Sequence, residues 1–369
     1  MPKIFRALGA MTGTSMDAID LALVETDGRA TLKFGPKASF AFSEADRALL
    51  RAAVAAAAAL NRRDERPGPL AQAETLITQR HLEAVRAFLE REGLSPAAID
   101  LIGFHGQTVL HRPERGLTVQ LGDGAFLARQ AGIDVVYDLR AADLERGGQG
   151  APLVPVYHAA LAQACGIDAP MLFVNIGGVA NVTFCAPGAP PLACDVGPGN
   201  ALLDDLMLTR TGRPMDADGA TARAGRVDEA ALTALLANCY FARKPPKSLD
   251  RNAFDPAPVA GLSLEDAAAT LVAFTTEGIL SAFSFVPKTP ELIVLCGGGA
   301  HNPALVEDIA ARAPCPVRRA EDFGWDSQAI EAQAFAYLAV RSAKGLPLTF
   351  PGTTGVREPA TGGKLAWAG

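Results

Sequence analysis

The segment GAMTGTSMDAID, residues 9–20, separates two apolar stretches near the N-terminus and constrains the fold more than any other part of the chain. Residues 4–27 have the pattern of a β-hairpin, and residues 30–42 extend it as a third strand. One or two glycines are enough for an ordinary hairpin turn. This connection is longer and mixes glycines, hydroxyls and carboxylates, so a plain turn does not account for it.

A phosphate-binding turn explains that composition better than a plain turn. Gly13, Thr14 and Ser15 combine small residues with hydroxyl groups, and Asp17 and Asp20 follow closely. Backbone N–H groups at small residues form a nest that favours a polyphosphate. A carboxylate one step away can hold the Mg²⁺ that accompanies such a phosphate.

The second half of the chain begins on the same plan. VNIGGVANVTF, residues 174–184, is again an apolar strand, a turn at Gly177 and Gly178, and a returning strand. By itself this pair of glycines is equally typical of a tight turn. With 369 residues, the chain is long for one core. The repeated hairpin therefore predicts two duplicated α/β domains with a ligand cleft between them.

The remaining pattern alternates strands with helices, which is typical of an α/β protein. We expect the first domain over residues 1–140, the second over 141–350, and an irregular tail over 351–369. Helical patterns cover residues 44–60, 68–92, 199–211, 228–242, 263–284 and much of 326–345.

A third glycine-rich loop, LIVLCGGGAHNPAL, places Gly297, Gly298 and Gly299 between an apolar strand and a helix. It matches neither the Walker phosphate loop nor the dinucleotide fingerprint. Glycines here allow a flat base or a ribose to approach the backbone. A close strand-to-helix turn is the alternative interpretation.

ACDVGPGNALLDDL, residues 193–206, is the stretch richest in chemistry. Asp195 ends an apolar segment before a Gly-Pro-Gly turn that leads into a helix. An aspartate in this place can simply cap the helix. It can also point into a site as a general base for phosphoryl transfer, where positioning and charge stabilisation dominate. We favour the base.

Composition excludes several classes of function. A net charge of −6 and a pI near 5.5 argue against nucleic-acid binding. No uninterrupted apolar run reaches the roughly 20 residues that span a bilayer, and the N-terminus lacks an export signal, so we expect a cytoplasmic protein. Six scattered cysteines predict neither disulfides nor a zinc site. No G-x-S-x-G sequence supports a serine hydrolase.

The ordered set of motifs resembles the anhydro-N-acetylmuramic acid kinase family, over nearly the whole chain from about residue 8 to about residue 363. The motifs are GAMTGTSMDAID, FHGQTVLHRP, GDGAFLARQAGIDVVYDLRAADL, GGQGAPLVP, VNIGGVANVT, DVGPGN, CGGGAHN and FPGTTGV. This resemblance implies an actin-, Hsp70- and hexokinase-like fold of two ribonuclease H-like domains. It also implies ATP and Mg²⁺ as cofactors and, without independent support from the sequence, a homodimer.

The family uses water to open the 1,6-anhydro bridge of its sugar while O6 receives the γ-phosphoryl group. The resemblance implies Asp195 as the base, with Glu331 as a second acidic candidate, although a solvated helical glutamate is the simpler interpretation of Glu331. It assigns Asp17 to Mg²⁺ through water. ATP would contact Gly13, Thr14, Ser15, Met16, Asp17, Ala18, Ile19, Asp20, Gly177, Gly178, Asn181, Gly297, Gly298 and Gly299. The sugar would contact His105, Gln107, Arg140, Gln149 and Asn200.

The chain departs from the family pattern at four positions: Ala10, Thr12, Ala18 and Val196. At Val196 the expected threonine hydroxyl beside the base is missing. Two other functions remain open on the sequence: a non-catalytic actin-like ATP switch, and a sugar kinase that acts on a free hydroxyl.

Overall fold

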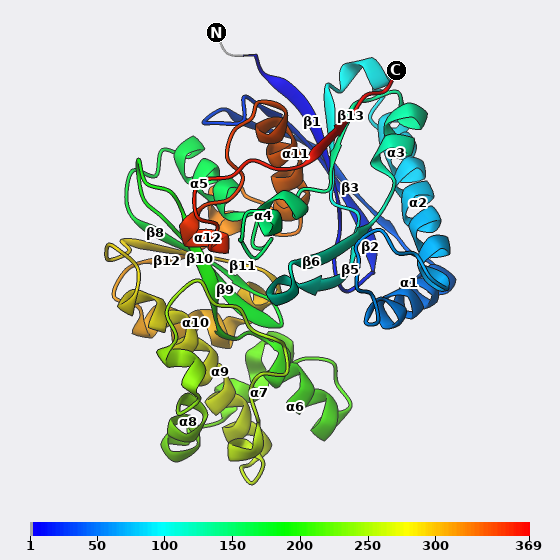
Figure 1. The fold of residues 1–369 in the computed structure, drawn as a ribbon. Helices are drawn as coiled ribbons and strands as arrows, with labels where there is room; N and C mark the ends of the chain where they lie inside the picture. The colour runs from blue at the N-terminus through cyan, green and yellow to red at the C-terminus, as the bar shows by residue number, and fades with distance from the viewer. Residues whose placement is uncertain (1–2) are drawn as a thin grey trace. The chain divides into compact units, whose positions relative to one another are not determined.

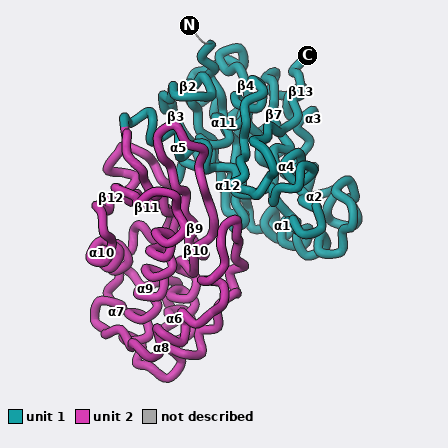
Figure 2. The backbone as a smooth tube through the Cα atoms, turned by 60° about the vertical axis from the view of Figure 1, so that its left-hand side comes forward, with its two compact units in different colours: residues 1–166, 328–369 teal, residues 167–327 magenta. Residues whose placement is uncertain are grey.

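The computed structural model describes residues 3–369, which form two compact units (Figure 2). Unit 1 contains the chain up to residue 166 together with 328–369, and unit 2 contains 167–327. Both boundaries differ from the predicted ones. Two helices explain the difference, because α5 (Pro155–Ala164) and α11 (Ile330–Ala343) join unit 1, where Tyr157 donates a hydrogen bond to Gln333.

Unit 1 is built on a six-stranded sheet with the order β13-β7-β4-β1-β2-β3. Strands β1, β2 and β3 form the predicted antiparallel meander, and β4 and β7 continue the sheet parallel to β1. The strands are β1 (Phe5–Thr12), β2 (Ala18–Thr26), β3 (Leu32–Ala41), β4 (Leu101–Phe104), β7 (Val135–Tyr137) and β13 (Lys364–Ala366).

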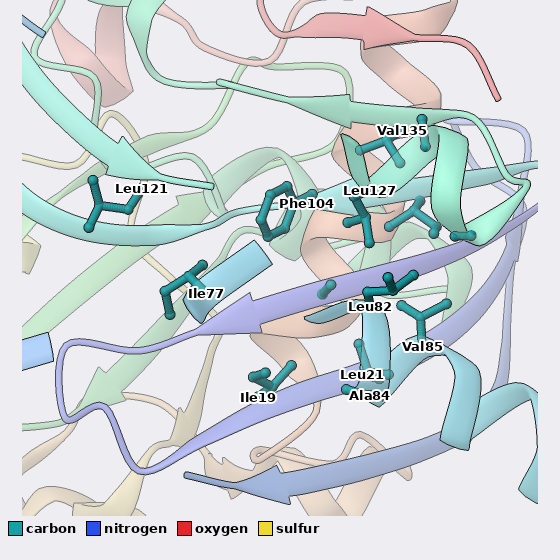
Figure 3. Packing of buried hydrophobic residues seen from close by; sticks show 14 of the residues in the cluster. Ile19, Leu21, Ile77, Leu82, Ala84, Val85, Phe104, Leu121, Leu127 and Val135 are labelled. Atoms are coloured by element: carbon teal, nitrogen blue, oxygen red, sulfur yellow. The ribbon is translucent and has the colours of Figure 1, made fainter. Parts of the chain in front are cut away.

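Helices cover both faces of this sheet (Figure 1). Apolar side chains that alternate along β1 and β2, such as Leu8 and Ile19, pack against α1, α2 and α3 in one buried cluster. Figure 3 shows part of this cluster, with Ile19 and Leu21 of β2 labelled. The opposite face packs against α11. The helices of unit 1 are α1 (Glu44–Ala57), α2 (Pro69–Arg91), α3 (Gly124–Ala131), α4 (Ala141–Glu145), α5, α11 and α12 (Pro351–Thr354).

Two glycines allow α11 to lie directly on the sheet. Gly9 in β1 and Gly103 in β4 are register partners. A Cβ atom on either would overlap a helix carbonyl oxygen, that of Ala332 or Phe335 respectively. Glycine is therefore required at both positions for close packing between helix and sheet.

Unit 2 repeats the sheet of unit 1. Its order, β10-β9-β8-β11-β12, has the same sequence of antiparallel and parallel pairs as β3-β2-β1-β4-β7. The predicted duplication and the α/β fold class with two ribonuclease H-like domains are confirmed. The strands are β8 (Met171–Ile176), β9 (Val179–Cys185), β10 (Leu192–Pro198), β11 (Leu292–Cys296) and β12 (Val317–Arg319).

The helices of unit 2 are α6 (Ala201–Thr211), α7 (Ala220–Ala224), α8 (Glu229–Leu236), α9 (Leu264–Leu280) and α10 (Pro303–Arg312). One of them, α9 with the short turn that follows it, is long and apolar enough to cross a membrane, over residues 264–284. Most of this segment is buried inside unit 2, as expected for a core helix of a globular protein.

Two parts of unit 1 differ from the sequence-based expectation. Residues 107–121, for which the sequence pattern predicted no strand, form a separate hairpin of β5 (Gln107–Arg112) and β6 (Leu117–Leu121). The tail expected to be irregular contributes α12 and the edge strand β13. Both additions are short strands or helices whose apolar pattern extends over too few residues to be recognised.

Candidate active site

A pocket of about 480 Å³ lies in unit 1 at the carboxyl ends of β1 and β4. Ligands of open α/β sheets commonly bind at this edge of the strands. The pocket brings together residues from motifs that lie far apart in the sequence. Its lining consists of Met11, Thr12, Gly13, Thr14, Ser15, His105, Thr108, His111, Arg140, Ala151 and Glu331.

Arg140 organises the polar wall of this pocket. Its Nη2 lies 3.1 Å from Nε2 of His105, and its Nη1 donates to the carbonyl of Gly150 at 2.9 Å. Burial lowers the pKa of Arg140 to about 10. Burial and the neighbouring guanidinium hold the pKa of His105 well below its ordinary value, so this imidazole is neutral and its Nε2 accepts from Arg140.

Glu331 lines the same pocket at the start of α11. Its side chain remains accessible to solvent within the pocket, yet the surrounding protein raises its pKa, an effect that Arg140 opposes and Asp20 reinforces. A glutamate on an outward helix face would have neither neighbour. Glu331 is therefore part of the candidate site rather than of an ordinary solvated surface.

The predicted phosphate turn connects β1 to β2 through residues 13–17. The N–H of Met16 donates to the carbonyl of Gly13, and Met16 has a positive φ of 57°. Non-glycine residues rarely adopt this conformation, and it is concentrated at ligand sites. The turn exposes the side chains of Thr14 and Ser15 toward the pocket.

The later residues of this motif lie elsewhere. Asp17 is mostly exposed and forms an ion pair with Arg47 at 3.6 Å. Ala18, Ile19 and Asp20 belong to β2, where the Ile19 side chain is in the core and Asp20 lines a different pocket. Because strand side chains alternate between faces, a run of eight consecutive residues does not bind one ligand through its side chains.

Two predicted sugar contacts, Gln107 and Gln149, are outside the pocket lining. The buried Gln107 amide donates to the carbonyl of Gly13, and so supports the turn from behind. The backbone N–H of Gln149 donates to the carbonyl of Thr354 at 2.8 Å. Both glutamines help to hold the walls of the pocket.

A buried carboxylate, Asp143, links the C-terminal segment to Arg140. Asp143 accepts from the Thr354 hydroxyl at 2.7 Å and from the N–H of Gly150 at 2.6 Å. The carbonyl of the same Gly150 receives the Arg140 guanidinium. No sequence pattern indicates this chain of hydrogen bonds, because Thr354 is remote in sequence from the other members.

We expect Thr354→Val to lower the melting temperature by about 2–4 °C, since it removes a donor from a buried carboxylate. It should also weaken the binding of a ligand in this pocket by about tenfold, because the position of Arg140 depends on Gly150 and Asp143. Thr349→Val is the matched control, because the buried Thr349 hydroxyl has no hydrogen-bond partner among residues 3–369. Thermal unfolding and steady-state kinetics compare the two; equal effects would contradict the assigned role of Thr354.

In unit 2, two glycine loops meet at Asn200. The Asn200 N–H donates to the carbonyl of Gly177 at 2.7 Å, which fixes the turn between β8 and β9. The Asn200 amide also lies beside Gly298 and Gly299, after β11. Asn200, predicted to contact sugar, therefore has as its neighbours the loops predicted to contact ATP.

The glycines of these loops differ in what the folded chain requires. A Cβ on Gly299 would crowd Ile176 and Asn200, and Gly297 has a positive φ of 81°, so turn geometry explains both. Gly177 and Gly178 lack a positive φ, and a Cβ added to them would meet its nearest atom only at 3.6 and 3.7 Å respectively. Gly13, in the unit 1 turn, is equally uncrowded. The folded chain itself therefore does not require glycine at these three positions, and the backbone there is open to close approach by a ligand.

Asp195 lies in β10 at an irregularity between Asp195 and Gly197. Bulges of this kind turn side chains toward active sites. The helix that follows is not capped by Asp195: its N-cap is Asn200, without a side-chain cap, and the Asp195 carboxylate accepts instead from the N–H of Leu249 at 2.7 Å. Burial raises the pKa of Asp195 to about 6, while the Leu249 N–H and Lys247 lower it. Asn181, on β9, is its register partner.

A segment that the sequence analysis did not single out, residues 240–249, surrounds Asp195. The Asp195 N–H donates to the carbonyl of Lys247, and the Tyr240 hydroxyl donates to the carbonyl of Asp195 at 2.7 Å. The only signal in the sequence was a lysine after two prolines in KPPKSLD. That pattern is equally typical of an exposed loop.

Comparisons with known proteins agree on one family. Residues 5–368 match the family described as "Anhydro-N-acetylmuramic acid kinase". A relative of that name from Methylobacterium nodulans is 53% identical, and the match covers 98% of this chain and 99% of the relative. Another, from Azorhizobium caulinodans, is also 53% identical, with 98% of each chain covered. Among solved structures, component A of (R)-2-hydroxyglutaryl-CoA dehydratase from Acidaminococcus fermentans is 11% identical with a TM-score of 0.48, covering 92% of this chain and 99% of that one.

The family and the duplicated α/β fold define the chain as a phosphotransferase. It belongs to the anhydro-N-acetylmuramic acid kinase family, as the resemblance of its motifs predicted.

Proposed function

We propose that the chain uses ATP to convert 1,6-anhydro-N-acetylmuramic acid into N-acetylmuramic acid 6-phosphate, a step of peptidoglycan recycling. Water attacks C1 and the bond from C1 to the bridging oxygen breaks. That oxygen stays on C6 and takes the γ-phosphoryl group, which releases ADP. The proton of the attacking water passes to a general base.

Asp195 is the base in this proposal, and its environment is the observation that carries the assignment. A general base works best with a pKa near the operating pH. Partial burial gives Asp195 a pKa of about 6, well above that of an ordinary aspartate, and one carboxylate oxygen is fixed by Leu249. Asp195 is thus held in place and can still accept a proton above about pH 6.

The pocket of unit 1 supports a role in binding the sugar. Arg140 supplies a cation for the carboxylate of the muramic acid, and neutral His105 supplies a further polar group. Glu331 adds an acceptor for sugar hydroxyls, or a second acid, at the same wall. We assign supporting roles to Gln107 and Gln149.

The glycine turns support phosphate binding. We assign the ATP phosphates to the backbone of residues 13–16 in unit 1 and to Gly177 and Gly178 in unit 2. The loop of Gly297–Gly299 would face adenosine, with Asn200 ordering that loop against the turn of Gly177.

Mg²⁺ fits this arrangement only as an ion held largely by phosphate and water. Among residues 3–369, no cluster of three or more histidine, cysteine or acidic side chains could hold a metal. The exposed carboxylate of Asp17, next to the turn, is suited to a contact through water, and Mg²⁺ commonly keeps several waters. When bound, the ion would neutralise charge on the transferring phosphate.

Mass spectrometry of the reaction in ¹⁸O-labelled water tests the reaction directly. We expect one ¹⁸O atom on C1 and none on the phosphate, provided that the reaction is stopped before the free anomeric hydroxyl exchanges with solvent. A phosphorylated product without label would favour a kinase for a free hydroxyl. No phosphorylated product would favour the ATP switch.

Two further properties are part of the proposal. We infer a cytoplasmic homodimer that acts on small molecules and binds neither nucleic acid nor membranes, in line with the acidic net charge of −6. Light scattering of the purified protein measures the oligomeric state, and a mass of one chain would contradict the dimer.

A further inference from the structure

Lys247 is the most unusual charged residue near Asp195. Its residue surface is only 4% exposed, and its ammonium Nζ has no hydrogen-bond partner among residues 3–369. Burying an unpaired ammonium is costly, and methionine or leucine would fill the same space without that cost. A charged Lys247 in this buried position therefore lowers the stability of the fold, and a functional role for the charge explains why a lysine is present.

The surroundings of Nζ hold the charge without neutralising it. Nζ lies 4.5 Å from the ring centroid of Tyr240 and 5.3 Å from that of Phe285. Aromatic rings attract a cation through their faces, yet they carry no net charge. The field of the ammonium therefore remains available to neighbouring groups.

Asp195 is the acidic neighbour that this field reaches. The backbone of Lys247 accepts from the Asp195 N–H, so the two residues are tied together. The other titratable groups that face this pair are Cys194, next to Asp195 on β10, and Tyr240 and Arg243, on the segment that carries Lys247. Cys194 and Tyr240 are protonated at neutral pH, because burial raises the pKa of each.

We propose that Lys247 is a positioning residue for the kinase reaction, whose ring-held ammonium keeps Asp195 ionised so that it can accept the proton of the attacking water. This inference rests on the assignment of Asp195 as the base. The segment of residues 240–249 then has two functions: Leu249 and Tyr240 fix the place of the carboxylate and its backbone, and Lys247 sets its charge.

The directions of the pKa shifts agree with this role. Burial raises the pKa of Asp195, and the Leu249 N–H and the Lys247 charge lower it again. Burial lowers the pKa of Lys247, whereas Cys194 and Asp195 act in the opposite direction. Without the ammonium, the carboxylate would lose one of its two stabilising partners, and its pKa would rise further above 6.

The decisive variant is Lys247→Met, which keeps the apolar stem and removes the charge. We expect the acid limb of the kcat–pH profile, near pH 6 in the wild type, to move up by about 1 unit. Turnover should then fall by about fivefold at pH 6. It should stay nearly unchanged at pH 8.5, where Asp195 is ionised in the wild type and in the variant alike. Lys247→Arg should restore the wild-type limb. Lys244→Met, which removes an exposed charge from the same segment, should leave it unchanged.

A second measurement is independent of turnover. ¹³C NMR of the enzyme labelled at aspartate carboxyls follows the titration of Asp195 directly, assigned by the signal that Asp195→Asn removes. An unchanged Asp195 titration in Lys247→Met would overturn the inference while leaving the base assignment intact. Equal loss of kcat at every pH would also overturn it, because it indicates a structural role. If Lys247→Met does not fold, the same titration in Lys247→Gln decides.

Failure of the proposed function gives a different result. If Asp195→Asn has normal turnover, Asp195 is not the base. This conclusion does not depend on how the Asp195 carboxyl titrates in the Lys247 variants. The two outcomes are therefore distinguishable.

Discussion

Asp195→Asn is expected to lower kcat by about 10²–10⁴-fold, because the amide cannot take a proton from the attacking water. The affinity for ATP should change by less than about twofold, since the glycine turns do not depend on this carboxylate. An asparagine oxygen can still accept from the N–H of Leu249, so the fold should be retained. Measuring ADP release and ATP binding by calorimetry separates the two effects.

The stability of the same variant should depend on pH in a defined direction. The pKa of Asp195 is about 6 in the folded chain and near 3.8 for an ordinary aspartate. Stability from this group is therefore fully present below about pH 4 and is lost as the pH rises through about 6. Relative to the wild type, Asp195→Asn should gain melting temperature as the pH rises from about 4 to about 6, and the gain should then stay constant up to pH 8. The control Asp205→Asn, at an exposed ion pair with Arg251, should show no such trend and normal turnover.

Gly178→Val is expected to raise KM for ATP by about 10²-fold with little change in melting temperature. In the folded chain a Cβ at Gly178 would meet no atom closer than 3.7 Å, so the added side chain should obstruct an approaching phosphate far more than it disturbs the folded chain. Gly261→Val is the matched control, because Gly261 is also in unit 2, has no neighbouring atom within 4 Å, and lies outside the candidate site. Both variants also carry the same added β-branched residue.

Nucleotide titration and thermal unfolding of both glycine variants give a clear comparison. A normal KM for ATP in Gly178→Val would refute the phosphate assignment of this turn. A large loss of stability in Gly178→Val alone would instead favour a plain turn whose geometry demands glycine.

Hydrophobic pattern and turn chemistry were sufficient to predict most of the fold. The glycine-interrupted hairpins at Gly13 and Gly177 identified the duplication because each hairpin is a local feature of adjacent residues. The domain boundaries were wrong because they depend on packing between distant segments. The sequence of α11 does not indicate that its backbone carbonyls pack against Gly9 and Gly103.

The candidate site was also predicted only in part: residues within recognisable motifs were identified, and residues that act through a neighbour were not. His105, Arg140 and Glu331 were nominated by motif and meet in one pocket. Lys247 and Asp143 were not nominated, since each acts through a hydrogen bond or a field on another residue. Asn200 was nominated for the sugar but lies between the loops assigned to ATP, because sequence order does not reveal which loops a residue will touch.

The position of α11 has a consequence for synthesis on the ribosome. The strands β1 and β4 are translated early, but the helix that rests on Gly9 and Gly103 is among the last segments to emerge. Unit 2 lies between these two parts of unit 1 in the sequence. Its whole chain is therefore synthesised before unit 1 is complete. We expect a released chain that ends just before residue 330 to hold a finished unit 2 and a first sheet with one bare face, which is the state a chaperone would recognise.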